Sequence, residues 1–221
     1  MTGHLTIDST NLFADAVGEH GLDPDEVAAQ GERLAPLRER LASEADGSAP
    51  GFFGLAFTNH HAEEARRWGQ WVTTHFDHLL VLGMGGSSLG GEMLVHCLGG
   101  DEPAVDVRFI DNIDPERMEA TLAGVALGRT CVLAVSKSGG TAETLAQLAT
   151  ILPRLERAVG AARVADHVIA LTESPDGALG QIASARGIPV VHHPAVGGRY
   201  AVLSPVGLIP AYAAGVDVAG V

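Results

Sequence analysis

The sequence predicts an α/β fold in which a five-stranded parallel sheet is covered by helices on both faces. Two observations support this prediction. From residue 78 onward, short apolar runs alternate with stretches of helical length, a pattern typical of right-handed strand–helix–strand units. Two of these runs also end in glycine- and serine-rich segments that open a helix, and such turns are where open parallel sheets bind ligands.

The first 75 residues are expected to form a helical, partly irregular segment that precedes the sheet domain at residues 76–221. Pro24 follows Asp23 and precedes two further acidic residues. This pattern predicts a helix start, because Pro fits the first turn and acidic groups interact favourably with the positive end of the helix dipole. The helix should reach about Leu41. Residues 43–54, rich in Gly, Ser and Pro, predict a linker.

The later elements follow in order along the chain. Strands are predicted where short runs of aliphatic residues occur, at residues 79–82, 105–110, 131–135, 167–171 and 189–191. Helices are predicted at residues 62–75, 89–98, 115–122, 141–159, 176–185 and about 202–214. Pro153 is expected to end or kink its helix, because proline lacks the N–H donor and clashes with the preceding turn.

The amino-acid composition excludes several classes of protein and of partner. The 221 residues are 46% hydrophobic and 19% charged, which favours a packed core over disorder. The net charge of −13 argues against a nucleic-acid partner, because that surface needs clustered cations. Cys97 and Cys131 have no disulfide or metal spacing and are expected to be buried free thiols. A signal peptide and a membrane-length apolar run are not found in the sequence, so a cytoplasmic protein without a membrane partner is expected.

A glycine-rich loop follows the first predicted strand. Residues 83–91 read GMGGSSLGG and open the next helix. Gly85 and Gly86 let the backbone turn and approach a ligand closely, while Ser87 and Ser88 add hydroxyl donors. The helix start contributes unpaired N–H groups and a positive dipole end. This combination predicts an anion site suited to phosphate.

A second loop of the same kind follows the third predicted strand. Residues 136–141 read SKSGGT, so Ser136, Ser138 and Thr141 bring three hydroxyl groups to another helix start. Lys137 is the one lysine of the chain. Two such loops at one edge of the sheet would hold a phosphate without a metal and without a cluster of cations, which suits an acidic protein.

A third loop, residues 196–200 (VGGRY), follows the fifth predicted strand. Gly198 would bring Arg199 close to a ligand, where the guanidinium would stabilise an enediolate oxyanion or help to bind phosphate. By itself, the segment is more typical of a surface arginine after a turn.

Two other interpretations compete with a phosphate site. A dinucleotide-binding turn needs a third glycine, and Ser88 occupies that position, although Asp106 or Asp111 would imitate its ribose-binding acid. The histidine pairs at 60–61 and 192–193 invite a metal interpretation. Adjacent residues of a strand point to opposite faces, and the sequence places no carboxylate or Cys to complete a recognisable set. We therefore expect neither a metal nor a cofactor.

Together the three loops resemble signatures of the glucose-6-phosphate isomerase family. Residues 83–90 resemble its G-x-G-G-S-x-L-G signature, residues 136–144 are similar to S-K-[ST]-x-[TG]-T-x-E-T, and residues 197–208 resemble G-G-R-[FY]-S-x-x-S-x-V-G-L. Order and spacing agree over about residues 50–217. The resemblance is therefore to the N-terminal half of that family, and jointly the motifs are highly specific.

The resemblance implies a sugar isomerase (SIS) domain, a flavodoxin-like three-layer sandwich. It also implies that the chain takes part in the aldose–ketose isomerisation of glucose 6-phosphate and fructose 6-phosphate through an enediol, a step of glycolysis and gluconeogenesis. Arg199 would stabilise the enediol. The residues implied in binding the sugar phosphate are Ser87, Ser136, Ser138, Thr141 and the backbone of Lys137.

One departure from the family is large. Its full-length members continue into a second SIS domain, which supplies the Glu that moves the proton, a His for ring opening and a Lys. This chain ends at Val221, so we expect a fragment, a truncated product or half of a split enzyme that binds a phosphosugar without turnover alone. Its expected partner is a second copy or a complementing C-terminal half. A non-catalytic SIS sensor of sugar phosphates stays open as an alternative.

Overall fold

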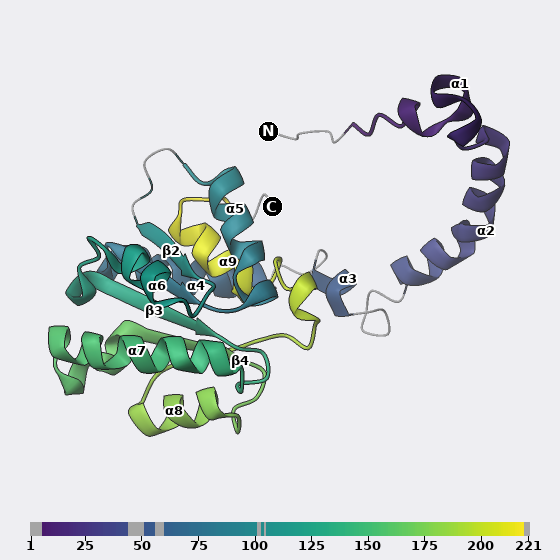
Figure 1. Cartoon of the computed structure of the whole chain (residues 1–221). Coiled ribbons are helices and arrows are strands. Elements are labelled where there is room, and N and C mark those ends of the chain that lie inside the picture. Colours follow the sequence, from purple (N-terminus) through teal and green to yellow (C-terminus); the bar gives the residue numbers. More distant parts are fainter. Residues whose placement is uncertain (1–5, 44–50, 56–59, 101–102, 104, 219–221) are drawn as a thin grey trace. The chain divides into compact units, whose positions relative to one another are not determined.

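The computed structural model describes residues 6–43, 51–55, 60–100, 103 and 105–218 (Figure 1). Contacts within the chain define two compact units, Met1–Ala49 and Pro50–Val221. The helices between residues 51 and 75 thus group with the sheet. The first strand begins at His78, two residues after the predicted start of the sheet domain at residue 76, and that domain boundary stays a prediction.

The first unit is built of helical segments: η1 Thr10–Leu12, α1 Ala14–Val17, η2 Gly18–His20 and α2 Pro24–Ser43. A parallel bridge joins Phe13 to Leu22. The α2 helix starts as predicted, and the Asp23 carboxylate accepts a hydrogen bond of 2.8 Å from the N–H of Asp25. Within the described part of this unit no side chain is buried, so it contributes no core of its own.

The second unit contains a five-stranded, all-parallel sheet with the order β2-β1-β3-β4-β5. This is the flavodoxin-like order, and it confirms the predicted fold class. Each predicted strand is present within two residues of its expected ends. The strands are β1 His78–Leu82, β2 Asp106–Ile110, β3 Thr130–Val135, β4 Val168–Thr172 and β5 Val190–His192.

Two apolar layers form because successive residues of a strand point to opposite faces of the sheet. In β1, Leu79 and Val81 belong to one core, whereas Leu80 and Leu82 belong to the other. The first core is closed by α4 His60–His75, α5 Leu89–Leu98 and α9 Pro205–Ala213. The second is closed by α6 Pro115–Leu122, α7 Ala142–Val159 and α8 Ala178–Arg186.

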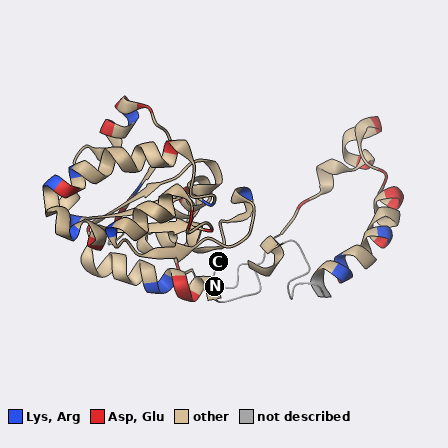
Figure 2. Cartoon of the chain, turned by 90° about the horizontal axis from the view of Figure 1, so that it is seen from below, with Lys and Arg blue, Asp and Glu red and all other residues tan. Residues whose placement is uncertain are grey.

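Figure 1 shows this sandwich with α5 and α9 on one side of the sheet and α7 and α8 on the other. Figure 2 shows charged residues of both signs on the helices, as expected for helices that turn one face to water. Among the described residues, no helix is long and apolar enough to cross a membrane.

Pro153 does not end its helix. The α7 helix continues past Pro153 to Val159, within one residue of the range predicted for it. Pro153 and Ala149 are both exposed, so water can satisfy the carbonyl that the proline leaves without a donor. Two other expectations about local structure were wrong. Part of the predicted linker forms a helix, α3 Gly51–Leu55, because Leu55 is buried. Cys97 is exposed, and only Cys131 is a buried thiol, whose pKa is raised by burial.

Candidate functional site

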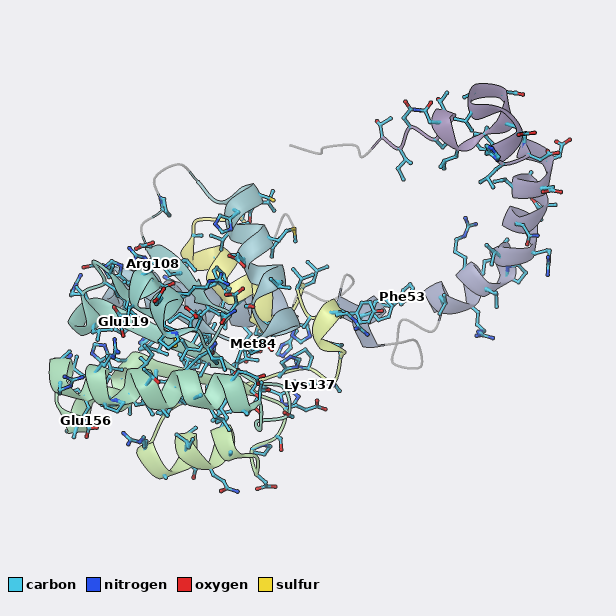
Figure 3. The ribbon with its side chains drawn as sticks, in the orientation of Figure 1. Phe53, Met84, Arg108, Glu119, Lys137 and Glu156 are labelled. Carbon is cyan, nitrogen blue, oxygen red and sulfur yellow. The ribbon has the colours of Figure 1, made fainter. Side chains whose placement is uncertain are left out.

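The three predicted loops leave the sheet at the carboxyl ends of β1, β3 and β5. β1 has β2 on one side and β3 on the other, so the strand order reverses between the first loop (residues 83–88) and the second (residues 136–141). Crevices at this switch point are where open α/β sheets bind ligands. Figure 3 shows Met84 and Lys137, one from each of these loops, at the same end of the sheet.

The second loop is organised by its own hydroxyl groups. Ser136 is buried, and its Oγ lies 2.8 Å from Thr141 Oγ1 and accepts a hydrogen bond of 3.3 Å from the Thr141 N–H. Ser138 is exposed, and its Oγ accepts from the Gly140 N–H at 3.2 Å. Gly139 turns the chain with φ +67, a conformation that favours glycine. The loop therefore presents one exposed and two inner hydroxyls at the start of α7.

Backbone donors surround these hydroxyls. Among the described residues, the N–H groups of Lys137 and Ser138 donate no hydrogen bond. The N-cap residue of α7, Thr141, does not cap the helix with its side chain. The first-turn N–H groups of an 18-residue helix thus point outward with the positive end of its dipole. Hydroxyls and unpaired N–H groups in this arrangement suit an anion such as phosphate.

The first loop repeats part of this pattern. It forms a short 3-10 helix, η3 Gly85–Ser87, which Gly85 enters with φ +55. Ser87 is half-buried, whereas Ser88 is buried and donates to the Gly85 carbonyl at 3.3 Å. Ser87 is therefore the hydroxyl of this loop that is left for a ligand, and α5 begins after it without a side-chain cap.

The third loop packs directly on the first. It contains the 3-10 helix η6 Gly198–Tyr200. A Cβ added to Gly86 would lie 2.2 Å from the carbonyl carbon of Gly198, so two glycine backbones are in contact here. Tyr200 stacks on Phe52 of α3, with ring centroids 4.5 Å apart. Arg199 is held between these two contacts, is exposed, and makes no hydrogen bond or ion pair within the described residues.

Sequence reasoning missed the residues that support the second loop from β4. The Lys137 carbonyl accepts hydrogen bonds from the Glu173 N–H at 3.0 Å and from Thr172 Oγ1 at 3.2 Å. Lys137 Nζ lies 3.4 Å from Glu173 Oε2, a partly exposed pair that contributes little stability. Glu173 directly follows the fourth strand. The other loops were selected because they follow the ends of strands, so the same criterion applied to the fourth strand would also have found Glu173.

His193, which the sequence analysis considered only as a metal ligand, also lies at this edge. It is fully buried, and its Nδ1 lies 2.7 Å from the Pro194 carbonyl, so Nδ1 must carry the donated proton. Nε2 is buried without a partner among the described residues. Burial lowers the pKa of His193, more than its hydrogen bond to Pro194 raises that pKa, and the charge of Lys137 lowers it further.

This lowered pKa predicts an acid-sensitive fold. In the unfolded chain His193 has a pKa near 6.5, so as the pH falls it binds a proton before it does so in the folded chain. The free energy of unfolding should therefore decrease as the pH drops below about 6.5 towards the lower pKa of the folded state. Urea unfolding at pH 7.5 and 5.5 should show this loss, and His193→Gln should reduce it. The control is His96→Gln, which replaces an exposed histidine. If His193→Gln changes the decrease in the free energy of unfolding between pH 7.5 and 5.5 no more than His96→Gln does, His193 does not cause that decrease.

Comparisons with known proteins agree with this geometry. Residues 58–219 match the family model of phosphoglucose isomerase. The glucose-6-phosphate isomerase of Carboxydothermus hydrogenoformans is 31% identical over 97% of this chain and 48% of the relative. A glucose-6-phosphate isomerase of Thermus thermophilus is 34% identical over 88% of this chain and 46% of the relative.

Solved structures show the same likeness. A crystal structure of a hypothetical protein from Thermus thermophilus has a TM-score of 0.76 at 33% identity and covers 88% of this chain and 47% of that one. A glucose-6-phosphate isomerase from Chlamydia trachomatis has a TM-score of 0.59 at 27% identity and covers 70% of this chain and 30% of that one. The chain spans about half the length of the first two curated relatives. Because the family match extends over most of the chain, the protein belongs to the phosphoglucose isomerase family.

Proposed function

We propose that this chain binds the phosphate of a hexose 6-phosphate and supplies the phosphate-binding half of a glucose-6-phosphate isomerase. One observation carries the proposal: Ser136, Ser138 and Thr141 converge with unpaired backbone N–H groups at the start of α7. These donors are neutral and local, so they hold an anion in a protein of net charge −13. The family membership supports the choice of a sugar phosphate over other anions. We propose the cytoplasm as its location.

Arg199 is proposed as the catalytic residue of this half. Isomerisation moves a proton between two neighbouring carbons and leaves negative charge on an enediolate oxygen. A guanidinium without a competing partner in the described structure, held beside the phosphate loops by the contact between Gly86 and Gly198, is suited to stabilise that charge. The reaction also needs a positioned general base, and we assign none among the described residues.

The test is calorimetric binding of fructose 6-phosphate to the purified chain. Ser138→Ala removes an exposed hydroxyl of the second loop and should weaken binding about threefold to tenfold, the usual effect of one hydrogen bond. Ser184→Ala, which removes an exposed hydroxyl on α8, is the matched control and should bind as the unchanged chain does. No binding by a chain whose circular dichroism shows a folded protein would refute the proposal.

An assay of turnover to glucose 6-phosphate on the same sample separates the finer alternatives. Binding without turnover supports a half that needs a base from elsewhere, or a sensor module. Turnover means that a base lies within this chain. Thermal stabilisation by a dinucleotide and not by a phosphosugar would instead support the nucleotide-binding interpretation.

A further inference from the structure

A second cluster of chemically active side chains lies at the start of α4. His60, His61 and Glu64 each offer one ligand atom, an imidazole nitrogen or a carboxylate oxygen, and these atoms all lie within 4.8 Å of one another. The strand geometry expected for the first histidine pair was wrong, because both residues open a helix. One turn later the same helix presents Glu64, since residues three and four apart are neighbours on a helix surface. Glu64 is therefore the carboxylate that the sequence analysis did not find, and the helix brings it next to the two histidines.

His60 is exposed, but the environment of His61 and Glu64 distinguishes them from solvated surface groups. His61 is half-buried, and its Nδ1 is buried without a hydrogen-bond partner in the described structure. Glu64 is also half-buried, and it makes no hydrogen bond or ion pair with any described residue. A half-buried carboxylate and a buried imidazole nitrogen are each costly to leave without a partner. A cation bound in the cluster would give each of them one.

The cluster combines two kinds of metal donor. A neutral imidazole coordinates a metal through a ring nitrogen. Glu64 adds the anionic oxygen that makes a two-histidine, one-carboxylate donor set.

We propose that His60, His61 and Glu64 bind a divalent transition-metal ion of the zinc class. Imidazole and carboxylate donors suit such ions, and three protein ligands leave a fourth position for water or another ligand. Around a tetrahedral zinc with bonds of about 2.0–2.2 Å, ligand atoms lie roughly 3.4 Å apart.

The site would lie at the edge of the sheet that carries the phosphate loops. The α4 helix leads into β1 through two residues and packs along the sheet, so its start faces the carboxyl end of β1. His192, whose charge acts on His61, is the last residue of β5 at the same edge. A bound ion would fix the first turn of α4 beside the candidate functional site. The proposal does not depend on the isomerase function.

The experiment is titration of the tag-free chain with Zn²⁺ by calorimetry and with Co²⁺ by visible absorption. We expect one tight site per chain and Co²⁺ bands typical of nitrogen and oxygen ligands. Glu64→Gln, which keeps the side-chain shape, and His61→Ala should each weaken Zn²⁺ binding more than about tenfold, because even an outer-shell partner is worth about 10- to 100-fold.

The matched controls come from the same helix. Glu63→Gln alters the exposed neighbouring carboxylate, and His75→Ala removes an exposed histidine from the far end of α4. Both should bind Zn²⁺ like the unchanged chain. Weak, non-stoichiometric Zn²⁺ binding by the unchanged chain would overturn the proposal. Equal Zn²⁺ affinity of all four variants would also overturn it, because Glu64→Gln and His61→Ala must then leave the site unaffected. Circular dichroism of each variant shows that a loss of binding does not come from unfolding, and Glu64→Gln serves as the deciding variant if His61→Ala does not fold.

Discussion

Replacing Gly86 by alanine should separate the first and third loops and abolish tight phosphosugar binding. The added Cβ would lie 2.2 Å from the carbonyl carbon of Gly198 and 2.3 Å from its oxygen, far inside ordinary contact distance. Both neighbours are backbone atoms, so no rotamer change can relieve the clash. We expect a loss of about 1–3 kcal/mol in the free energy of unfolding, the usual cost of overpacking.

The functional consequence should be larger than the loss of stability. Arg199 directly follows Gly198, so a displaced third loop moves the guanidinium, and a displaced first loop moves Ser87. We expect affinity for fructose 6-phosphate to fall more than about tenfold, or 1.4 kcal/mol, when measured by calorimetry. Urea unfolding of the same variant gives its stability.

The control for this variant is Gly128→Ala. A Cβ at Gly128 would meet no atom within 4 Å, and the residue does not have a positive φ. This variant should keep both stability and affinity. A Gly86→Ala protein with unchanged affinity would mean that the contact between the two glycine loops does not position the ligand.

The sheet was predictable from sequence because its strands are buried on both faces. A strand covered on both sides reads as a continuous apolar run, as the Cys131–Val135 stretch does, and such runs contrast sharply with the loops between them. The positions of the three glycine-rich loops were predictable for a related reason. Glycines and hydroxyls concentrated directly after a strand have few structural roles other than a turn or a ligand site.

Features that depend on tertiary contact were not predictable. The α3 helix lies in a segment rich in Gly and Pro, and its Phe52 is anchored by stacking on Tyr200, nearly 150 residues away in the sequence. The contact between Gly86 and Gly198 likewise joins two loops that are distant in the chain. Local propensity carries no information about such partners.

The prediction that the histidines at 60–61 point to opposite faces was wrong for a different reason. Adjacent histidines predict opposite faces only in a strand, whereas in a helix they are about 100° apart and share a neighbour one turn later. The error in secondary structure therefore hid Glu64 as a third member of the cluster. Extending the helix that was expected from residue 62 back to residue 60 would have revealed it.

Replacing Thr141 by valine should weaken phosphate binding strongly while leaving the fold intact. Valine keeps the branched shape and removes the hydroxyl, which lies 2.8 Å from the buried Ser136 Oγ. The substitution therefore deletes one proposed phosphate donor and also frees Ser136 Oγ to rotate. Losing a hydrogen bond inside a polar network costs about 1–3 kcal/mol, so affinity for fructose 6-phosphate should fall about 5- to 150-fold in calorimetric titrations.

Thr141→Ser is the matched control, because it restores the hydroxyl and removes only a methyl group. It should bind within about threefold of the unchanged chain, since a few tenths of a kcal/mol is the scale of a surface substitution. Inorganic phosphate supplies a second readout. If the hydroxyl contacts the phosphate group, Thr141→Val must weaken inorganic phosphate and fructose 6-phosphate by similar factors. A loss confined to the sugar phosphate would place Thr141 against the sugar and would contradict the assignment of this loop to phosphate.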